Sequence, residues 1–355
     1  MQFGIHDFVT IEIDDEFPWQ DDWRNILSNV PGGAEPGPGG RRTRMRLNYT
    51  KELSDDSMLK IDEGIYASDE FLLDRKYGVR FRQTEQYALE LWTNNACLEW
   101  QVWGIQLALL QNAASFIHCA TVARDGEALM FAARGGVGKT TITRLLVGEM
   151  GWKFMGDDYI ILSSDGSCYS FPQPMVLYSY HKGVFPEVFS VGRGPLSPAL
   201  TNDLLSRMAV LIKPLLRPFP RALQFARKHN PQSVQIDPLE VFGREKLASQ
   251  AVLTKVVWLE RSPGLRRVRL EPEPERLVSR VFGSTYANLD PWCSRLITTA
   301  MSTGILDAND VYPKWLSVLD EAFARTSRYT LLLPVELRAE DMHADIRDMM
   351  KQMER

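Results

Sequence analysis

The chain has 355 residues, with 45% hydrophobic and 24% charged side chains and a formal net charge of −4. It is long enough for one large buried core or two modest ones, and its near-neutral charge gives no global reason to expect nucleic acid as a partner. Its four well-separated cysteines show neither zinc-ligand spacing nor a disulfide framework. Because neither a signal-peptide pattern nor an apolar run of membrane-spanning length is found, we expect a cytoplasmic protein without a membrane span.

The first hundred residues are dominated by short runs typical of β-strands. Residues 5–13 alternate apolar and polar side chains, which predicts a strand, and similar runs recur between residues 44 and 95. Glycine and proline dominate residues 30–44, so this segment is predicted to be a loop or linker. We therefore predict a β-rich N-terminal module over residues 1–100, followed by a packing helix within residues 98–114.

The middle of the chain mixes strands and helices. Residues 115–133 contain two strand-like runs joined by Arg-Asp-Gly, which is a tight-turn signal. A glycine-rich loop and a helix come next, and further strands are predicted within residues 152–171. The loop therefore belongs to a mixed α/β sheet.

The C-terminal third continues the same pattern. Residues 253–261 and 265–273 are predicted to be paired strands, and residues 328–337 to form the last strand. The chain ends in a predicted amphipathic helix at residues 340–353. We predict a single α/β domain over residues 101–355.

An unusually basic segment interrupts this domain, within a predicted helical insertion at about residues 195–250. No acidic residue lies between Asp203 and Asp237, whereas six basic residues do: Arg207, Lys213, Arg217, Arg221, Arg227 and Lys228. Basic amphipathic segments can bind acidic partners or membranes. The simpler interpretation is a proline-broken helical hairpin whose basic side is solvated, and the sequence leaves both open.

The clearest local pattern is a phosphate-binding loop, ARGGVGKT, at residues 133–140. It matches the Walker A pattern except that Ala133 replaces the first glycine, which is tolerable where φ is negative. In such a loop, backbone N–H groups and the N-terminus of the next helix converge on phosphate oxygens. The lysine reaches the β- and γ-phosphates, and the threonine hydroxyl is placed for Mg²⁺. We therefore predict that ATP and Mg²⁺ bind here, with nucleotide contacts from Gly135, Gly136, Val137, Gly138, Lys139, Thr140 and Thr141.

The loop alone does not separate ATPase switches, GTPases and kinases. It differs by one residue from the KGGVGKTT loop of partition ATPases, with Arg134 at the position of their signature lysine. A switch that hydrolyses ATP slowly and binds a partner is therefore the alternative. More than 130 residues precede the loop, which counts against that family. A GTPase would carry an NKxD motif downstream, and the sequence has none.

Three stretches flank the loop in a characteristic order. They are the strand pair FIHCATVARDGEALMFAA, the segment GWKFMGDD and the proline-punctuated SFPQPMVL. Together with GGVGKTT they resemble the C-terminal catalytic domain of HPr kinase/phosphorylase and the wider HPr-kinase-like serine kinases. The resemblance covers residues 105–180 well, 250–340 loosely and 1–100 not at all. It implies an α/β fold, a P-loop kinase domain of the HPr-kinase/PEP-carboxykinase-like type, to which the β-rich module and the basic insertion are added.

The resemblance also implies roles for particular residues. Phosphoryl transfer to an alcohol needs one acidic group for the hydroxyl proton and another for Mg²⁺. Asp157 and Asp158 are expected to divide these roles, in an order that the sequence leaves open. His118 matches the family's histidine near the phosphates. The expected catalytic residues are Asp157, Asp158, His118 and Lys139, and the expected metal ligands are Thr140, Asp157 and Asp158.

A later family motif, similar to EIRGLG, has only a loose counterpart here. Residues 185–196 offer Glu187 and Arg193 as candidate equivalents, and this departure counts against the HPr protein as substrate and against phosphorylase activity. We expect a kinase that phosphorylates a hydroxyl, serine before others, of a protein, peptide or small molecule. Related kinases with nonstandard N-terminal modules include ones that modify natural-product peptides. A homo-oligomer fits the resemblance, because HPr kinases are hexamers.

Overall fold

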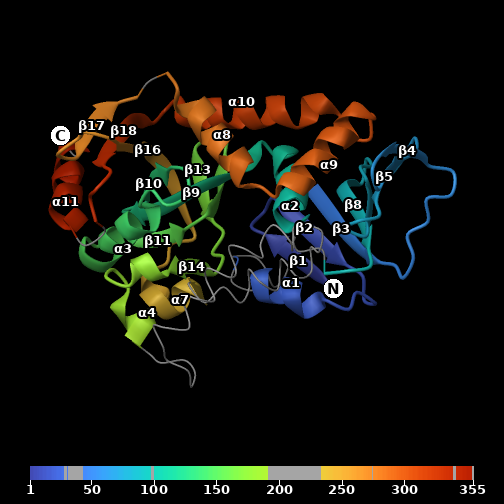
Figure 1. The fold of residues 1–355 in the computed structure, drawn as a ribbon, viewed down its shortest axis with the longest axis horizontal. Helices are drawn as coiled ribbons and strands as arrows, with labels where there is room; N and C mark the ends of the chain where they lie inside the picture. The colour runs from blue at the N-terminus through green and yellow to red at the C-terminus, as the bar shows by residue number, and fades with distance from the viewer. Residues whose placement is uncertain are drawn as a thin grey trace.

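The computed structural model describes residues 1–27, 30, 43–96, 100–190, 233–273, 275–338 and 341–353. Most of the predicted glycine- and proline-rich loop, the whole basic segment 203–229 and Arg193 lie outside the described residues. The described residues form two large sheets and one small sheet with helices around them, which is a mixed α/β architecture. In Figure 1 the N-terminal strands lie on the right and the strands next to the predicted phosphate loop on the left.

The N-terminal strands form one sheet. They are β1 (Gln2–Ile5), β2 (Val9–Ile13), β3 (Thr43–Tyr49), β4 (Leu59–Asp62), β5 (Ile65–Ala67), β6 (Leu72–Asp74), β7 (Val79–Arg82) and β8 (Tyr87–Thr93). Their order is β1-β2-β3-β8-β7-β6-β5-β4. The predicted single strand over residues 5–13 is wrong, because β1 and β2 form an antiparallel hairpin. The chain reverses at His6, which has a positive φ of 46°. The alternation of apolar and polar side chains over residues 5–13 therefore spans a turn and does not mark one strand.

The second large sheet holds the strands that surround the phosphate loop. Its strands are β9 (Ala114–Arg124), β10 (Glu127–Ala132), β11 (Lys153–Gly156), β12 (Tyr159–Ser163), β13 (Ser167–Ser170), β16 (Gln250–Ser262), β17 (Arg269–Pro272) and β18 (Ser327–Pro334). The order is β10-β9-β12-β13-β16-β18-β17, with β11 paired to β9. Strand β16 also pairs in parallel with β10, which closes a circuit of pairings. The predicted Arg-Asp-Gly turn is confirmed, since Asp125 and Gly126 both have positive φ between β9 and β10.

One predicted strand pairing in this sheet is wrong. Residues 253–261 and 265–273 do contain strands β16 and β17, but these two do not pair with each other. Strand β18 lies between them, parallel to β16 and antiparallel to β17. Because β16 and β17 are close in sequence, a hairpin was expected, but β18 inserts between them.

Helix α2 (Trp100–Leu110) lies between the two large sheets. It contacts β3 and β8 on one side and β9 on the other, and its residues Trp100 and Trp103 are fully buried. A helix enclosed on all sides needs no polar face, which explains the almost uniformly apolar sequence from Trp100 to Leu110. One continuous apolar core therefore joins residues of both sheets.

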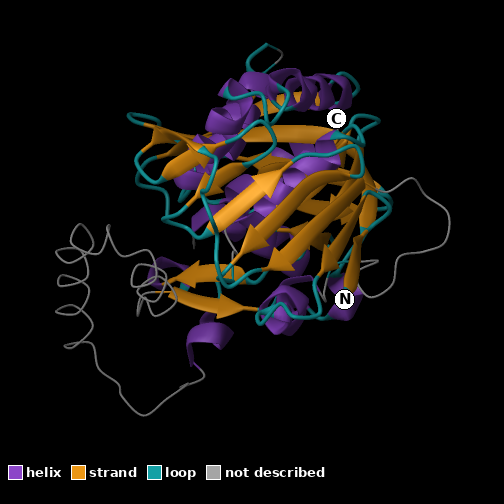
Figure 2. Ribbon diagram, turned by 90° about the vertical axis from the view of Figure 1, so that its right-hand side faces the viewer, coloured by secondary structure: helices purple, strands orange, loops and turns teal. Residues whose placement is uncertain are grey.

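The remaining helices cover the edges of this arrangement. They are α1 (Gln20–Leu27), α3 (Lys139–Glu149), α4 (Pro186–Ser190), α7 (Pro238–Phe242), α8 (Leu277–Asn288), α9 (Pro291–Ser302), α10 (Tyr312–Phe323) and α11 (Met342–Met353). Figure 1 shows α8, α9 and α10 along the top, and α3 and α11 on the left. Figure 2 shows the strands gathered in the centre with helices above and below them. Within the part of the chain that the structure describes, every helix is too short or too polar to span a bilayer.

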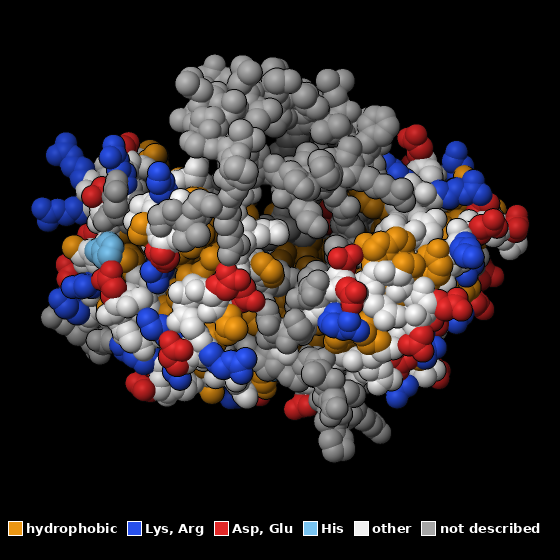
Figure 3. All heavy atoms as spheres, turned by 90° about the horizontal axis from the view of Figure 1, so that it is seen from below, with side chains coloured by type: hydrophobic (Ala, Val, Ile, Leu, Met, Phe, Trp, Pro, Cys, Tyr) orange, Lys and Arg blue, Asp and Glu red, His pale blue; other side chains and the backbone are white. Residues whose placement is uncertain are grey.

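A second apolar core lies under the phosphate loop. Helices α3 and α11 pack there against the small sheet of β14 (Met175–Tyr178) and β15 (Ser233–Ile236). On the described part of the face in Figure 3, acidic and basic side chains are intermingled on both flanks. This mixing agrees with the near-neutral net charge, and the absence of a nucleic-acid partner stays a prediction.

Candidate active site

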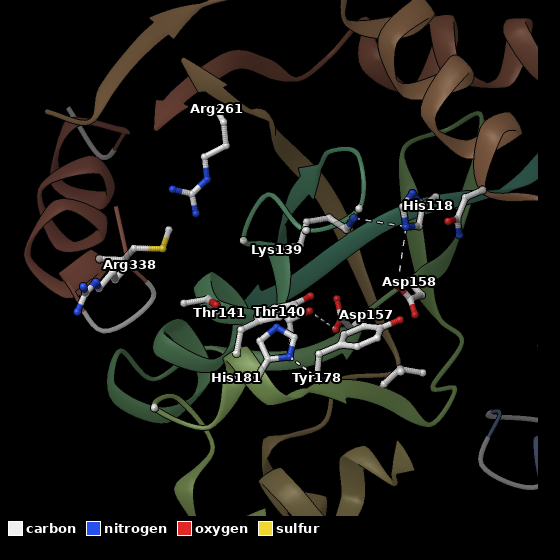
Figure 4. A pocket seen from close by; sticks show the side chains of 18 residues that line it. His118, Lys139, Thr140, Thr141, Asp157, Asp158, Tyr178, His181, Arg261 and Arg338 are labelled. Atoms are coloured by element: carbon white, nitrogen blue, oxygen red, sulfur yellow. Dashed lines mark hydrogen bonds and ion pairs between the residues drawn. The ribbon is translucent and has the colours of Figure 1, made fainter. Parts of the chain in front are cut away.

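The predicted phosphate loop, the two aspartates and His118 line one pocket of about 670 Å³. Figure 4 shows its side chains: Lys139 points toward His118, and Thr140 toward Asp157. The pocket lies at the end of β10, where the loop begins, with β14 along another wall. The sequence therefore identified residues that the fold brings together.

The loop has the backbone geometry that its glycines allow. Gly136 and Gly138 have φ of 77° and 130°, which residues with a Cβ rarely adopt. Ala133, which replaces the first Walker glycine, keeps a negative φ and is fully buried. Helix α3 then begins at Lys139, so its N-terminus faces the pocket.

All but one of the predicted nucleotide contacts line the pocket. Val137 is the exception: its side chain packs against the apolar core under the loop, and its carbonyl accepts a hydrogen bond from Arg261 at 3.2 Å. The residues that line the pocket are Gly135, Gly136, Gly138, Lys139, Thr140 and Thr141. Their contact with a nucleotide stays a prediction.

Strand pairing brings Asp158 to His118. Tyr159 at the start of β12 lies opposite His118 of β9, so the preceding residue reaches the same height on the sheet. The Asp158 carbonyl accepts a hydrogen bond from the Cys119 N–H at 3.2 Å, and its Oδ1 lies 3.7 Å from His118 Nε2. Asp158 has a φ of 82°, which is rare for a residue other than glycine and is often found at functional sites.

Gly156 permits this tight turn. A Cβ at that position would lie 2.6 Å from the Tyr159 carbonyl oxygen, so a side chain would force the backbone apart. The turn presents the two adjacent carboxylates to one pocket in different environments. Asp157 is buried, whereas the Asp158 side chain is about half exposed, at 46%.

The buried Asp157 carboxylate is only half satisfied. The Thr140 hydroxyl donates to its Oδ2 at 2.8 Å, while Oδ1 has no hydrogen-bond partner among the described residues. Burial, and next the neighbouring Asp158 charge, raise the pKa of Asp157 to about 7. The pKa of Asp158 shifts the other way: burial raises it, but His118 and Lys139 together outweigh burial and lower it.

Lys139 and His118 meet at the centre of the pocket. Lys139 Nζ donates to the Ala133 carbonyl at 3.1 Å and lies 3.3 Å from His118 Nε2. Burial lowers the pKa of both groups below their usual values. His118 Nδ1 lies 3.5 Å from the Ser284 hydroxyl. Ser284 in turn donates to the Ala133 carbonyl at 3.0 Å, which holds the histidine in place.

These residues fit a hydrated Mg²⁺ ion. The Thr140 hydroxyl, the free oxygen of Asp157 and the Asp158 carboxylate are all hard oxygen ligands. The described residues contain no group of three or more His, Cys, Asp or Glu side chains that could enclose a metal. Mg²⁺ is usually held by one or two carboxylates with water and substrate phosphates completing its shell, so this limited ligand set suits it.

Sequence reasoning missed Arg261, which lies on the wall opposite the aspartates. Its position depends on the parallel pairing of β16 with β10, because this pairing brings the carboxyl end of β16 beside the loop after β10. Besides Val137, its guanidinium donates to the carbonyls of Pro334 and Leu337 at 2.7 and 2.9 Å. A basic residue at the end of a strand is a signal only once the neighbouring parallel strand is known.

Sequence reasoning also missed three residues at the end of β14. Tyr178, Tyr180 and His181 line the pocket, from a strand and a 3₁₀ turn, Ser179–His181. The SFPQPMVL stretch suggested the strand but not the 3₁₀ turn after it. No local pattern marks a tyrosine or histidine there as part of a site.

The suggested counterpart of the later family motif does not reach the pocket. Glu187 of α4 forms an ion pair with Arg144 of α3, at 2.9 Å between Oε1 and Nη2, and it is not among the residues that line the pocket. Its suggested metal or phosphate role therefore has no support from its position. Arg193 lies outside the described residues.

A search of solved structures finds weak likenesses to this chain. The structure of the HPr(Ser) kinase/phosphatase from Coxiella burnetii is similar to this chain with a TM-score of 0.30 and 11% sequence identity, over 68% of this chain and 99% of that chain. No family model matches the chain, and no curated protein matches it. The chemistry of the site is therefore argued from its own geometry.

Proposed function

We propose that the protein is an ATP- and Mg²⁺-dependent kinase that transfers the γ-phosphoryl group of ATP to a hydroxyl, with serine as the first acceptor to test. The observation that carries this proposal is the pair of adjacent carboxylates in unlike environments beside a phosphate loop. One is buried and bonded to Thr140, and the other is half exposed near His118. An accessible carboxylate at that place can take the proton of an acceptor hydroxyl.

The environments favour one division of labour between the aspartates. Asp157, with Thr140, would hold Mg²⁺, because its free oxygen is buried and otherwise unpaired among the described residues. Asp158 would accept the acceptor proton, since its side chain is accessible and its pKa, which His118 and Lys139 lower against the effect of burial, keeps it ionised. Bound Mg²⁺ would neutralise charge on the β- and γ-phosphates.

The proposed transfer balances in atoms and charge. The acceptor oxygen forms a bond to the γ-phosphorus, the bond from that phosphorus to the bridging oxygen of ADP breaks, and the hydroxyl proton passes to Asp158. Lys139 would stabilise the charge that develops on the phosphate oxygens. His118 would keep Lys139 and Asp158 in position through the contacts at 3.3 and 3.7 Å.

A protein, a peptide such as a natural-product precursor, or a small molecule would each supply the hydroxyl. We propose that residues 1–100 and the basic segment 207–228 recognise the acceptor, which would favour an acidic one. The sequence resemblance to HPr-kinase-like serine kinases supports a kinase of this type.

A transfer assay tests the proposal. The protein is incubated with ATP, Mg²⁺ and a library of serine peptides with acidic and neutral flanks, and mass spectrometry detects gains of about 80 Da, the mass that a phosphoryl group adds. Phosphorylated peptide from the native protein but not from Asp158→Asn supports it. ATP-dependent dimerisation with no phosphorylated product from any acceptor would instead support the partition-ATPase-like switch.

A further inference from the structure

His181 is a buried polar residue of the pocket that the mechanism above does not use. It ends the 3₁₀ turn after β14 and is 5% exposed. Its ring packs against Tyr180 at a centroid distance of 4.3 Å and against Phe185 at 6.2 Å. Figure 4 draws it next to Thr140 and Asp157, which line the same pocket.

One hydrogen bond fixes the tautomer of His181. The backbone N–H of Tyr178 donates to His181 Nδ1 at 3.0 Å, so Nδ1 carries no proton. In a neutral imidazole the proton then resides on Nε2. Burial lowers the pKa of His181 to about 4, so the ring stays a neutral Nε2–H donor across the physiological range.

This donor has no acceptor within the described protein. Nδ1 makes the bond to Tyr178, and no hydrogen bond from Nε2 to a described residue is found. Among the described residues, Nε2 of His181 is not one of the fully buried polar atoms that lack a partner, so this N–H is accessible in the pocket, where a ligand can take the place of water as its acceptor. The open space next to the ring is the pocket that holds the phosphate loop.

We propose that His181 Nε2–H donates a hydrogen bond to a non-bridging oxygen of the terminal phosphoryl group of the bound nucleotide. This inference rests on the proposed binding of ATP in the pocket. In the view of Figure 4 the ring is on the same side of the pocket as Thr140 and Asp157, which would hold Mg²⁺, and Mg²⁺ would lie beside the β- and γ-phosphates. A neutral donor suits that place, because it stabilises phosphate charge without competing with Mg²⁺ or repelling it.

Two substitutions separate the donor from the structural bond. In His181→Asn the amide oxygen can still accept from the Tyr178 N–H, but no donor reaches the Nε2 position. In His181→Gln the longer side chain restores a donor near that position. His343→Gln is the matched control. His343 of α11 has its Nδ1 3.2 Å from Oε1 of Glu149, and it does not line the pocket.

The measurement is the affinity for ADP·Mg²⁺ and for ADP·BeF₃⁻·Mg²⁺, in which the fluoride complex stands in for the terminal phosphoryl group. His181→Asn should weaken ADP·BeF₃⁻ binding by about 10- to 100-fold, the range for a lost hydrogen bond to a charged group. It should leave ADP binding within about twofold, and His181→Gln should recover most of the difference. His343→Gln should match the native protein in both.

The other outcomes have distinct meanings. Equal affinities of His181→Asn and the native protein for the fluoride complex overturn the assignment of His181, and so does an equal loss for both ligands, which would indicate a purely structural role. If the native protein binds ADP·BeF₃⁻ in the predicted way but phosphorylates no acceptor, the His181 contact stands and the proposed kinase function fails.

Discussion

In the N-terminal sheet Glu12 accepts hydrogen bonds from Arg46 and from the Tyr87 hydroxyl, at 2.6 and 3.0 Å, whereas in the pocket Asp157 keeps one oxygen without any partner among the described residues. Both carboxylates are largely removed from solvent. In the sheet, the hydrogen bond to Glu12 is the main cause that raises the pKa of Arg46, which is how a stabilising ion pair behaves. In the pocket, burial instead raises the pKa of Asp157.

The two carboxylates illustrate two roles of a buried charge. Glu12 is paired and stabilises the fold, whereas Asp157 has an oxygen that is left for a ligand. Burying an anion without a partner opposes folding, so a sequence keeps one only where something else depends on it. The free oxygen of Asp157 and the free donor of His181 lie around the same phosphate loop. The Asp157 oxygen can bind a cation and the His181 N–H can donate to an anion. ATP·Mg²⁺ would supply both.

The strongest effect is expected on the reaction itself. Asp158→Asn should lower phosphoryl transfer by about 10²- to 10⁴-fold, the usual contribution of a general base. ATP affinity should change little, because the substituted side chain lies beside His118 and not against the loop glycines. Single-turnover transfer measured together with nucleotide affinity checks this, and retention of native transfer rates would remove Asp158 from the base role.

The next effect tests the paired carboxylate of the N-terminal sheet. Glu12→Gln should lower the free energy of unfolding by about 1.5–3 kcal/mol, the value for hydrogen bonds to charged groups, since Arg46 and Tyr87 lose their acceptor charge. Urea unfolding monitored by circular dichroism measures it, with the exposed Glu63→Gln as control. Unchanged stability would show that this ion pair contributes nothing to the fold.

The raised pKa of Asp157 predicts a pH dependence of Mg²⁺ binding. A carboxylate with a pKa of about 7 is protonated at lower pH, and a protonated carboxyl is a poor Mg²⁺ ligand. The affinity for ATP·Mg²⁺ should therefore fall by about tenfold between pH 8 and pH 6. Calorimetric titration at both pH values measures the affinity for ATP with and without Mg²⁺. An equal ratio of these two affinities at pH 8 and at pH 6 would refute the prediction.

The weakest effect is expected for Glu187. Its ion pair with Arg144 is partly exposed, and such pairs contribute at most about 1 kcal/mol. Glu187→Gln should alter phosphoryl transfer by less than about twofold, because Glu187 does not line the pocket and its substitution changes stability little. A loss comparable to that of Asp158→Asn would instead restore Glu187 as an acidic residue of the active site.

The sequence predicted local features well and distant juxtapositions poorly. The Arg-Asp-Gly hairpin, the loop and its helix depend on residues close together in the chain, and so does the adjacent pair Asp157 and Asp158. Arg261 enters the site only because β16 runs parallel to β10, and β18 separates β16 from β17 although it comes many residues later in the chain. His181 was missed for a similar reason, since its place depends on how β14 crosses below the loop.

The decisive measurement is the unfolding free energy of Asp157→Asn at pH 8, with and without ATP·Mg²⁺. Because burial raises the pKa of Asp157, its contribution to stability is present at low pH and is lost as pH rises through about 7. Without ligand, Asp157→Asn should therefore be more stable than the native protein by about 1–3 kcal/mol. With ATP·Mg²⁺ near 100 times its Kd, the native protein should gain about 2.7 kcal/mol and the variant almost none. A variant that is less stable without ligand, or that gains as much from ATP·Mg²⁺, would contradict the claim that Asp157 is kept unpaired for a bound cation.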